Sequence, residues 1–92
     1  MEIHRFITKA CCGKTAVYFK IDRSISKDFL PLFISNGFSE LTNFTQAGIL
    51  YIEDDYLIAT GAFGTDKIQV KCKKSNCQEN LNNFENLLKQ LG

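Results

Sequence analysis

The sequence contains no tryptophan, one proline, one histidine and one methionine, and its formal net charge is only +1. A single histidine, His4, excludes a metal site built on paired histidines. The near-neutral charge argues against a domain that depends on a polyanion, because such domains usually have a pI above about 9. The longest uninterrupted apolar run, residues 29–34, is far shorter than the roughly 20 residues that cross a bilayer.

What is present fits one small globular domain. The 92 residues are 45% hydrophobic and 12% aromatic, which is enough for one modest core over residues 1–92. The N-terminus lacks the apolar region and cleavage site of a signal peptide, and the C-terminus lacks a lipidation motif. We therefore expect a cytoplasmic protein, with no membrane association and with its thiols reduced.

The first part of the chain predicts a β-hairpin and a helix. Residues 2–9 are read as one strand, and residues 14–22 alternate in polarity as a second strand does. Residues 27–36 predict a helix that Ser26 caps and that Asn36-Gly37 ends. Pro31 lies just past its first turn, so a late start or a local distortion is expected there.

The second part predicts three strands and a final helix. Residues 38–47 fit either a helical turn or an extended strand. Residues 48–53 and 56–63 flank Asp54-Asp55 as a hairpin, residues 67–73 form a half-exposed strand, and residues 76–91 form an amphipathic helix. The order β-β-α-β-β-β-α predicts the α+β class: a mainly antiparallel sheet with two helices packed on one face.

Four cysteines are the most conspicuous chemical feature of the chain. Cys72 and Cys77 fall on expected core faces, and we interpret them as small buried hydrophobic residues rather than metal ligands. Cys11 and Cys12 lie in an expected turn beside Lys14, where a nearby cation favours a reactive thiol. We nevertheless favour inert packing for this pair, because cysteines are commonly buried, and a metal site formed by all four cysteines stays open.

Lysines form the second candidate site. Lys67, Lys71, Lys73 and Lys74 cluster around the last strand, and Tyr18 and Lys20 extend the same face if their strand lies nearby. A basic strand face with an aromatic residue suits nucleic-acid phosphates or an acidic protein surface. The near-neutral total charge favours the other interpretation, that lysines on an edge strand only prevent aggregation.

Nothing in the sequence points to an enzyme or to a cofactor. His4 has no evident catalytic partner, and the carboxylates of residues 53–55 suit a solvated turn, since the twelve-residue calcium loop is absent. Gly61-x-x-Gly64 lacks the lysine of a phosphate-binding loop, so it indicates a bulge or a close backbone contact.

From residue 26 onward, the order α-β-β-β-α resembles the double-stranded RNA-binding domain. Lys71, Lys73 and Lys74 lie just before the last helix, where that family also carries lysines. Asp54-Asp55 occupies the first hairpin loop, where an acidic pair would repel phosphate. The resemblance is one of topology, because residues 75–79 lack the family's helix start and the N-terminal hairpin has no counterpart.

Three functions follow as hypotheses. The first is a non-enzymatic module that binds a protein partner or self-associates through its sheet, since an exposed strand edge accepts another strand. The second is nucleic-acid binding through the lysine face. The third is a thiol or metal role for the cysteines.

Overall fold

A computed structural model describes residues 2–9, 15–74 and 77–91 of the chain. Six strands form one fully antiparallel sheet in the order β1-β2-β6-β5-β4-β3. The strands are β1 (Ile3–Lys9), β2 (Thr15–Ile21), β3 (Ser39–Glu40), β4 (Ile49–Glu53), β5 (Leu57–Ala62) and β6 (Lys67–Cys72). The predicted α+β class is confirmed, and every predicted strand is present within two residues of its expected bounds.

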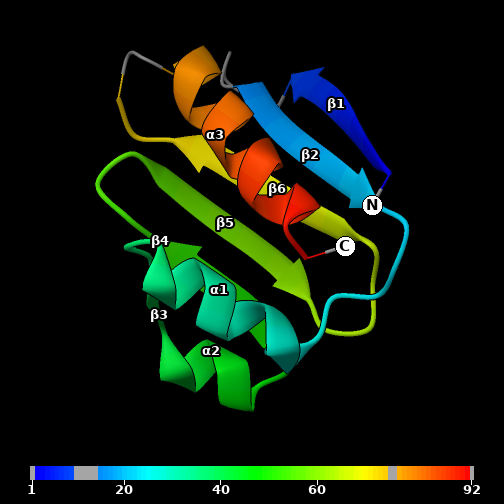
Figure 1. Cartoon of the computed structure of the whole chain (residues 1–92), viewed down its shortest axis with the longest axis vertical. Helices are drawn as coiled ribbons and strands as arrows, with labels where there is room; N and C mark the ends of the chain where they lie inside the picture. The colour runs from blue at the N-terminus through cyan, green and yellow to red at the C-terminus, as the bar shows by residue number, and fades with distance from the viewer. Residues whose placement is uncertain (1, 10–14, 75–76, 92) are drawn as a thin grey trace.

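Helices α1 (Leu30–Ser35) and α3 (Cys77–Lys89) lie on the same side of this sheet (Figure 1). We call this side the helix face and the opposite side the open face. Alternation along each strand sends one set of side chains to each face. Val17, Phe19 and Ile21 of β2 are buried on the helix face, as their spacing predicts.

The first helix has two parts. A 3-10 turn, η2 (Lys27–Phe29), precedes α1, and Pro31 occupies one of the first two positions of α1. Proline is tolerated there because the first N–H groups of a helix have no intrahelical partner. The late start predicted from Pro31 is therefore confirmed.

Residues 38–47 contain both of the structures that their sequence allows. The two-residue strand β3 pairs with β4, and the five-residue helix α2 (Thr42–Gln46) follows it. No residue of α2 is buried, but Phe44 stacks on Tyr51 of β4 with ring centroids 4.9 Å apart. This short connection therefore forms one edge of the sheet through β3.

An aromatic cluster joins the two helices to the sheet. The ring of Phe84 in α3 lies 5.5 Å from that of Phe33 in α1 and 5.5 Å from that of Phe19 in β2. Phe38 packs edge-on against both Phe33 and Phe84. Phe19, Phe33 and Phe84 are at most 2% exposed, so these residues form the centre of the core.

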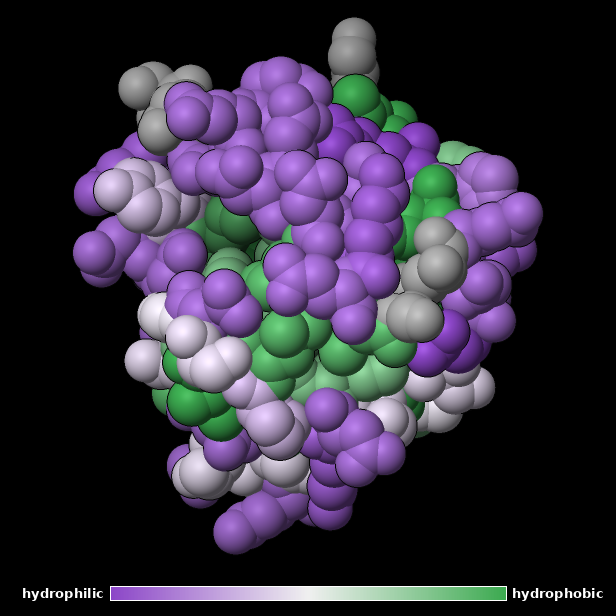
Figure 2. All heavy atoms as spheres, in the orientation of Figure 1, coloured by the Kyte–Doolittle hydropathy of each residue, from purple (hydrophilic) through white to green (hydrophobic). Residues whose placement is uncertain are grey.

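The outer side of α3 is polar, and hydrophobic side chains form a band beside it towards α1 (Figure 2). The apolar stripe of α3 faces inward, with Leu81, Phe84 and Leu88 buried. None of the helices in the described part of the chain has the length and apolar character that crossing a bilayer requires.

Candidate functional site

The open face carries no buried residue among those that the structure describes. The strand register defines rows of side chains that run across it. One row, from β1 to β4, contains Phe6, Tyr18, Gln69, Thr60 and Tyr51. Adjacent strands lie about 4.8 Å apart, so this row is about 19 Å long.

We call this first row the aromatic row, after Phe6, Tyr18 and Tyr51. A second row, of basic side chains, runs beside the part of it that lies on β1, β2 and β6. His4 pairs with Lys20 across β1 and β2, and Lys20 pairs with Lys67 across β2 and β6. These residues are two positions along their strands from the aromatic row, which corresponds to about 7 Å. Lys71 lies on the same face of β6. All four side chains are exposed, and none has an ion-pair partner among the described residues.

The two rows meet in a hollow of about 500 Å³ that Phe6, Tyr18, Lys20 and Lys67 line. Phe6 is 47% exposed, although a phenylalanine is normally buried. Neither Phe6 nor Tyr18 has a ring contact with another aromatic residue in the described part of the chain. The hollow therefore combines uncovered aromatic surface with two unpaired ammonium groups.

The arrangement of this hollow is costly for the fold. Like charges that face each other directly across two strands destabilise a sheet, and Lys20 faces Lys67 in this way. An anion bound between the two lysines removes that repulsion. The chemistry of the hollow is therefore suited to a ligand that carries both negative charge and a planar apolar surface.

Two of the predicted site lysines lie elsewhere. Lys73 Nζ donates to Glu53 Oε2 and to the carbonyl oxygen of Asp54, both at 2.8 Å. The hydrogen bond to Glu53 raises the pKa of Lys73 above its ordinary value. Lys74 Nζ lies 4.9 Å from the ring centroid of Tyr56. These two cations follow β6 and contact residues at the β4–β5 turn, and the structure does not bring them together with Lys20 and Lys67.

The β4–β5 turn also differs from the predicted two-residue loop. Asp54 accepts hydrogen bonds from the backbone N–H groups of Tyr56 and Leu57, both at 2.8 Å, so residues 54–56 all belong to the turn. A carboxylate that satisfies the backbone two and three residues later stabilises such a turn locally. A structural role therefore accounts for Asp54.

Phe6 is the site residue that the sequence did not single out. It is paired with Tyr18, and the predicted hairpin of residues 2–9 and 14–22 provided a signal for that pairing. The β2–β6 pairing had no such signal, because 45 residues separate the end of β2 at Ile21 from the start of β6 at Lys67. Only the strand order places Tyr18 and Lys20 beside β6.

Cys72 and Cys77 are joined by a disulfide between the end of β6 and the start of α3, with Cα atoms 5.5 Å apart. The prediction of two free, buried thiols is wrong, although both residues pack against the core while partly exposed. Their bonded sulfur atoms are not available as thiolate ligands. Reduced thiols were expected from the compartment alone, although the two cysteines are only 5 positions apart in the sequence.

The other cysteine prediction, a reactive thiol or metal ligand at Cys11 and Cys12, lies outside the described residues. Within residues 2–9, 15–74 and 77–91, no group of three or more histidine, cysteine or acidic side chains is placed to hold a metal ion. Among the described residues, the open face is therefore the remaining candidate for a ligand site.

No protein-family model, curated protein or solved structure matches the chain. The resemblance to the double-stranded RNA-binding domain therefore rests on the predicted element order, and the structure places β3 and α2 between α1 and β4, which that order did not include.

Proposed function

We propose that the chain is a small, non-enzymatic binding module that takes single-stranded nucleic acid on its open face. The hollow of Phe6, Tyr18, Lys20 and Lys67 is the observation that carries the proposal. Bases stack on uncovered aromatic rings, and lysines neutralise phosphates. A nucleotide carries its base and its phosphate as separate groups, and the open face offers an aromatic row and a basic row side by side.

The free aromatic surface favours single strands over duplexes. In a duplex the bases stack on one another, so a protein ring has no base face to cover. The row is therefore suited to unpaired bases at its β1–β2 end, because Tyr51 at the other end is already stacked on Phe44.

The charge distribution also supports an anionic ligand on this part of the face. His4, Lys20, Lys67 and Lys71 lie on β1, β2 and β6, whereas Glu53 lies at the far side on β4 and is bound by Lys73. The chain as a whole is nearly neutral, so its affinity for polyanions depends on this one area.

Fluorescence anisotropy with a labelled single-stranded oligonucleotide at low salt tests the proposal. We expect binding that weakens as salt rises, with a roughly tenfold loss in Phe6→Ala from the lost stacking. Lys20→Glu is expected to cost at least about tenfold, since it removes one attractive charge and adds a repulsive one.

Lys27→Glu is the matched control, because Lys27 is exposed in η2 and lies off the open face. It makes the same change in net charge and is expected to retain most of the affinity. No binding of the wild-type chain at low salt would end the proposal. Equal losses in Lys20→Glu and Lys27→Glu would show that only net charge matters, which also contradicts a site on the open face.

The cytoplasmic location stays a prediction from the sequence. The Cys72–Cys77 bond weighs against it, because disulfides are uncommon in compartments that keep thiols reduced. Rapid acid quenching of host cells, followed by alkylation and mass measurement, tests this point. Free, alkylated thiols at both positions are expected in the cytoplasm, and a bonded pair would place the chain in an oxidising compartment.

A further inference from the structure

We propose that β1 is the interface of a twofold-symmetric dimer, in which the edge of β1 pairs antiparallel with β1 of a second copy. The two edges of the sheet differ in a way that points to this strand. β1 has seven residues and lies at one edge, whereas β3 at the other edge has two residues and leads directly into α2 (Figure 1). Of the two edges in the described sheet, only β1 offers a long row of unpaired backbone groups to another strand.

Both sides of β1 are apolar at its centre. Ile7 is 68% exposed and Phe6 is 47% exposed, and the two residues point to opposite faces of the sheet. Ile7 lies on the helix face, in register with Val17, while Phe6 lies on the open face, in register with Tyr18. An edge strand with such a centre tends to recruit another strand unless charges guard it.

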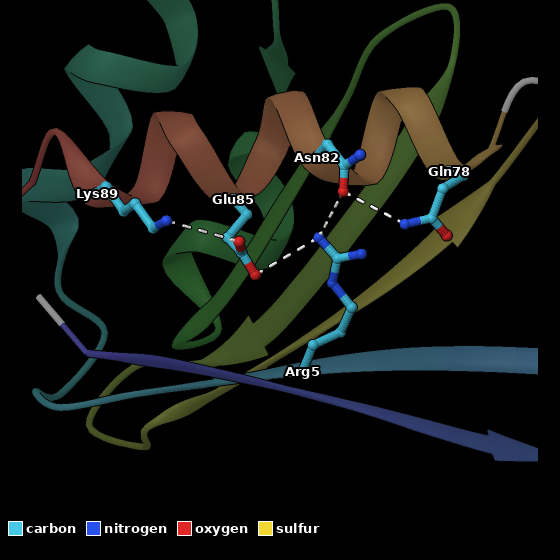
Figure 3. A network of polar contacts seen from close by, with 5 residues as sticks. All are labelled: Arg5, Gln78, Asn82, Glu85 and Lys89. Carbon is cyan, nitrogen blue, oxygen red and sulfur yellow. Dashed lines mark hydrogen bonds and ion pairs between the residues drawn. The ribbon is translucent and has the colours of Figure 1, made fainter.

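The arginine at the centre of β1, Arg5, is turned away from the edge. Arg5 Nη2 donates to Asn82 Oδ1 at 3.1 Å and lies 3.4 Å from Glu85 Oε1, both on α3. Figure 3 shows its side chain rising from β1 between these two residues. The Arg5 guanidinium also lies 5.3 Å from the ring centroid of Phe19. The arginine is therefore held over the helix face of its own subunit.

The charge of Arg5 favours a register of β1 that is centred on Phe6 over one that is centred on Arg5. A twofold axis perpendicular to the sheet must pass beside one residue that faces its own copy, because opposed side chains have to share a face. An axis at Arg5 would oppose two arginines. An axis at Phe6 opposes Phe6 with Phe6 and Arg5 with Ile7, so no two basic residues face each other.

Dimerisation in this register would make a continuous twelve-stranded sheet with both open faces on the same side, since it joins two six-stranded sheets. The two hollows would then flank a central pair of Phe6 rings. This dimer brings Phe6, a residue of the hollow, against its own copy, but it needs no nucleic acid, because its other contacts are the backbone of β1 and the Ile7 side chain on the helix face.

Sedimentation velocity of the full chain over a range of concentrations tests the inference, with two variants of opposite charge. Ile7→Lys would place an ammonium group opposite Arg5 of the second copy and is expected to weaken the dimer at least tenfold. Ile7→Glu would oppose a carboxylate with that arginine and is expected to retain the dimer. Ile34→Lys in α1 is the matched control, because Ile34 is 47% exposed and lies away from β1, and it should dimerise as the wild type does.

A monomer at all concentrations overturns the proposal, and so does an unchanged dimer in Ile7→Lys. Loss of the dimer in both Ile7 variants overturns the register. Oligonucleotide binding by monomeric Ile7→Lys separates the two proposals, because its open face is unaltered. If Ile7→Lys binds the oligonucleotide, the binding proposal holds even where the wild-type chain forms no dimer. If Ile7→Lys has the expected weakened dimer but does not bind the oligonucleotide, only the binding proposal fails.

Discussion

Lys20 and Lys67 face each other across β2 and β6 on the open face, without an acidic partner among the described residues. Such an arrangement lowers the stability of the sheet, and residues kept for binding often do so. The proposed function therefore makes stability and affinity respond in opposite directions to the same substitution.

Lys67→Glu should raise the free energy of unfolding by about 1 kcal/mol, because an opposite-charge pair replaces a like-charge pair. The same variant should bind single-stranded oligonucleotides at least about tenfold more weakly. Urea unfolding and fluorescence anisotropy measure the two effects. Lys71→Glu is the control for stability, since Lys71 faces Ile58 and should change the unfolding free energy by less than about 0.5 kcal/mol. A Lys67→Glu variant that is both less stable and equally tight in binding would contradict the argument.

Gly61→Ala should lower the free energy of unfolding by about 1–3 kcal/mol, as overpacking of a core does. A Cβ atom at Gly61 would lie 2.7 Å from Ile25 Cδ1 and 2.9 Å from the carbonyl oxygen of Lys67. Ile25→Val removes the first of these atoms, so the double variant should be more stable than the sum of the two single effects. Strict additivity in urea unfolding would show that the close contact with Ile25 does not matter.

Local patterns predicted the strands and the helices well. Alternation over Val17, Phe19 and Ile21 indicated which side of β2 is buried, and Pro31 indicated the late helix start; both expectations are confirmed. The Gly61 prediction of a close backbone contact is also confirmed, by the carbonyl oxygen of Lys67. These features depend on residues close together in the chain, where spacing carries the information.

Features that depend on distant residues were not accessible in the same way. The lysines of 67–74 looked like one cluster, but the hydrogen bonds of Lys73 with Glu53 and Asp54 are set by the pairing of β5 with β6 and of β4 with β5. The Cys72–Cys77 bond is a different case, because its cysteines are only 5 positions apart; it was missed because reduced thiols were expected from the compartment. The spacing of side chains along a strand predicts which of its faces is buried. It does not predict which other strands lie beside it.

Reduction of the Cys72–Cys77 bond should lower the free energy of unfolding by about 2 kcal/mol, the chain-entropy value for a short closed loop. The sequence separation of the two cysteines is 5, so the bond constrains only a small part of the unfolded chain. Urea unfolding of Cys77→Ala with and without a thiol reductant checks this, because the variant should lose its sensitivity to the reductant. Equal sensitivity in both proteins would assign the effect to Cys11 and Cys12.

Phe84→Ala should lower the free energy of unfolding by about 3–5 kcal/mol, because it removes a buried ring from the centre of the core. Phe84 contacts Phe19, Phe33 and Phe38 and is 2% exposed. Phe84→Leu retains most of the volume and is expected to cost less than half as much. Similar losses in the two variants, measured by urea unfolding, would show that ring stacking matters more than cavity formation.

Glu53→Gln should lower the pKa of Lys73 towards its ordinary value of 10.5, because the hydrogen bond to the Glu53 carboxylate is the largest cause of its elevation. In the wild type, the raised pKa means that charged Lys73 stabilises the fold fully below pH 10.5, and this contribution is lost as the pH rises through the higher folded value. The variant should therefore lose less stability across this alkaline window. NMR titration of the lysine side chains gives the pKa directly. Glu79→Gln on α3 makes the same charge change away from the β4–β5 turn and should leave the pKa of Lys73 unchanged, so equal shifts in the two variants would contradict the assigned cause.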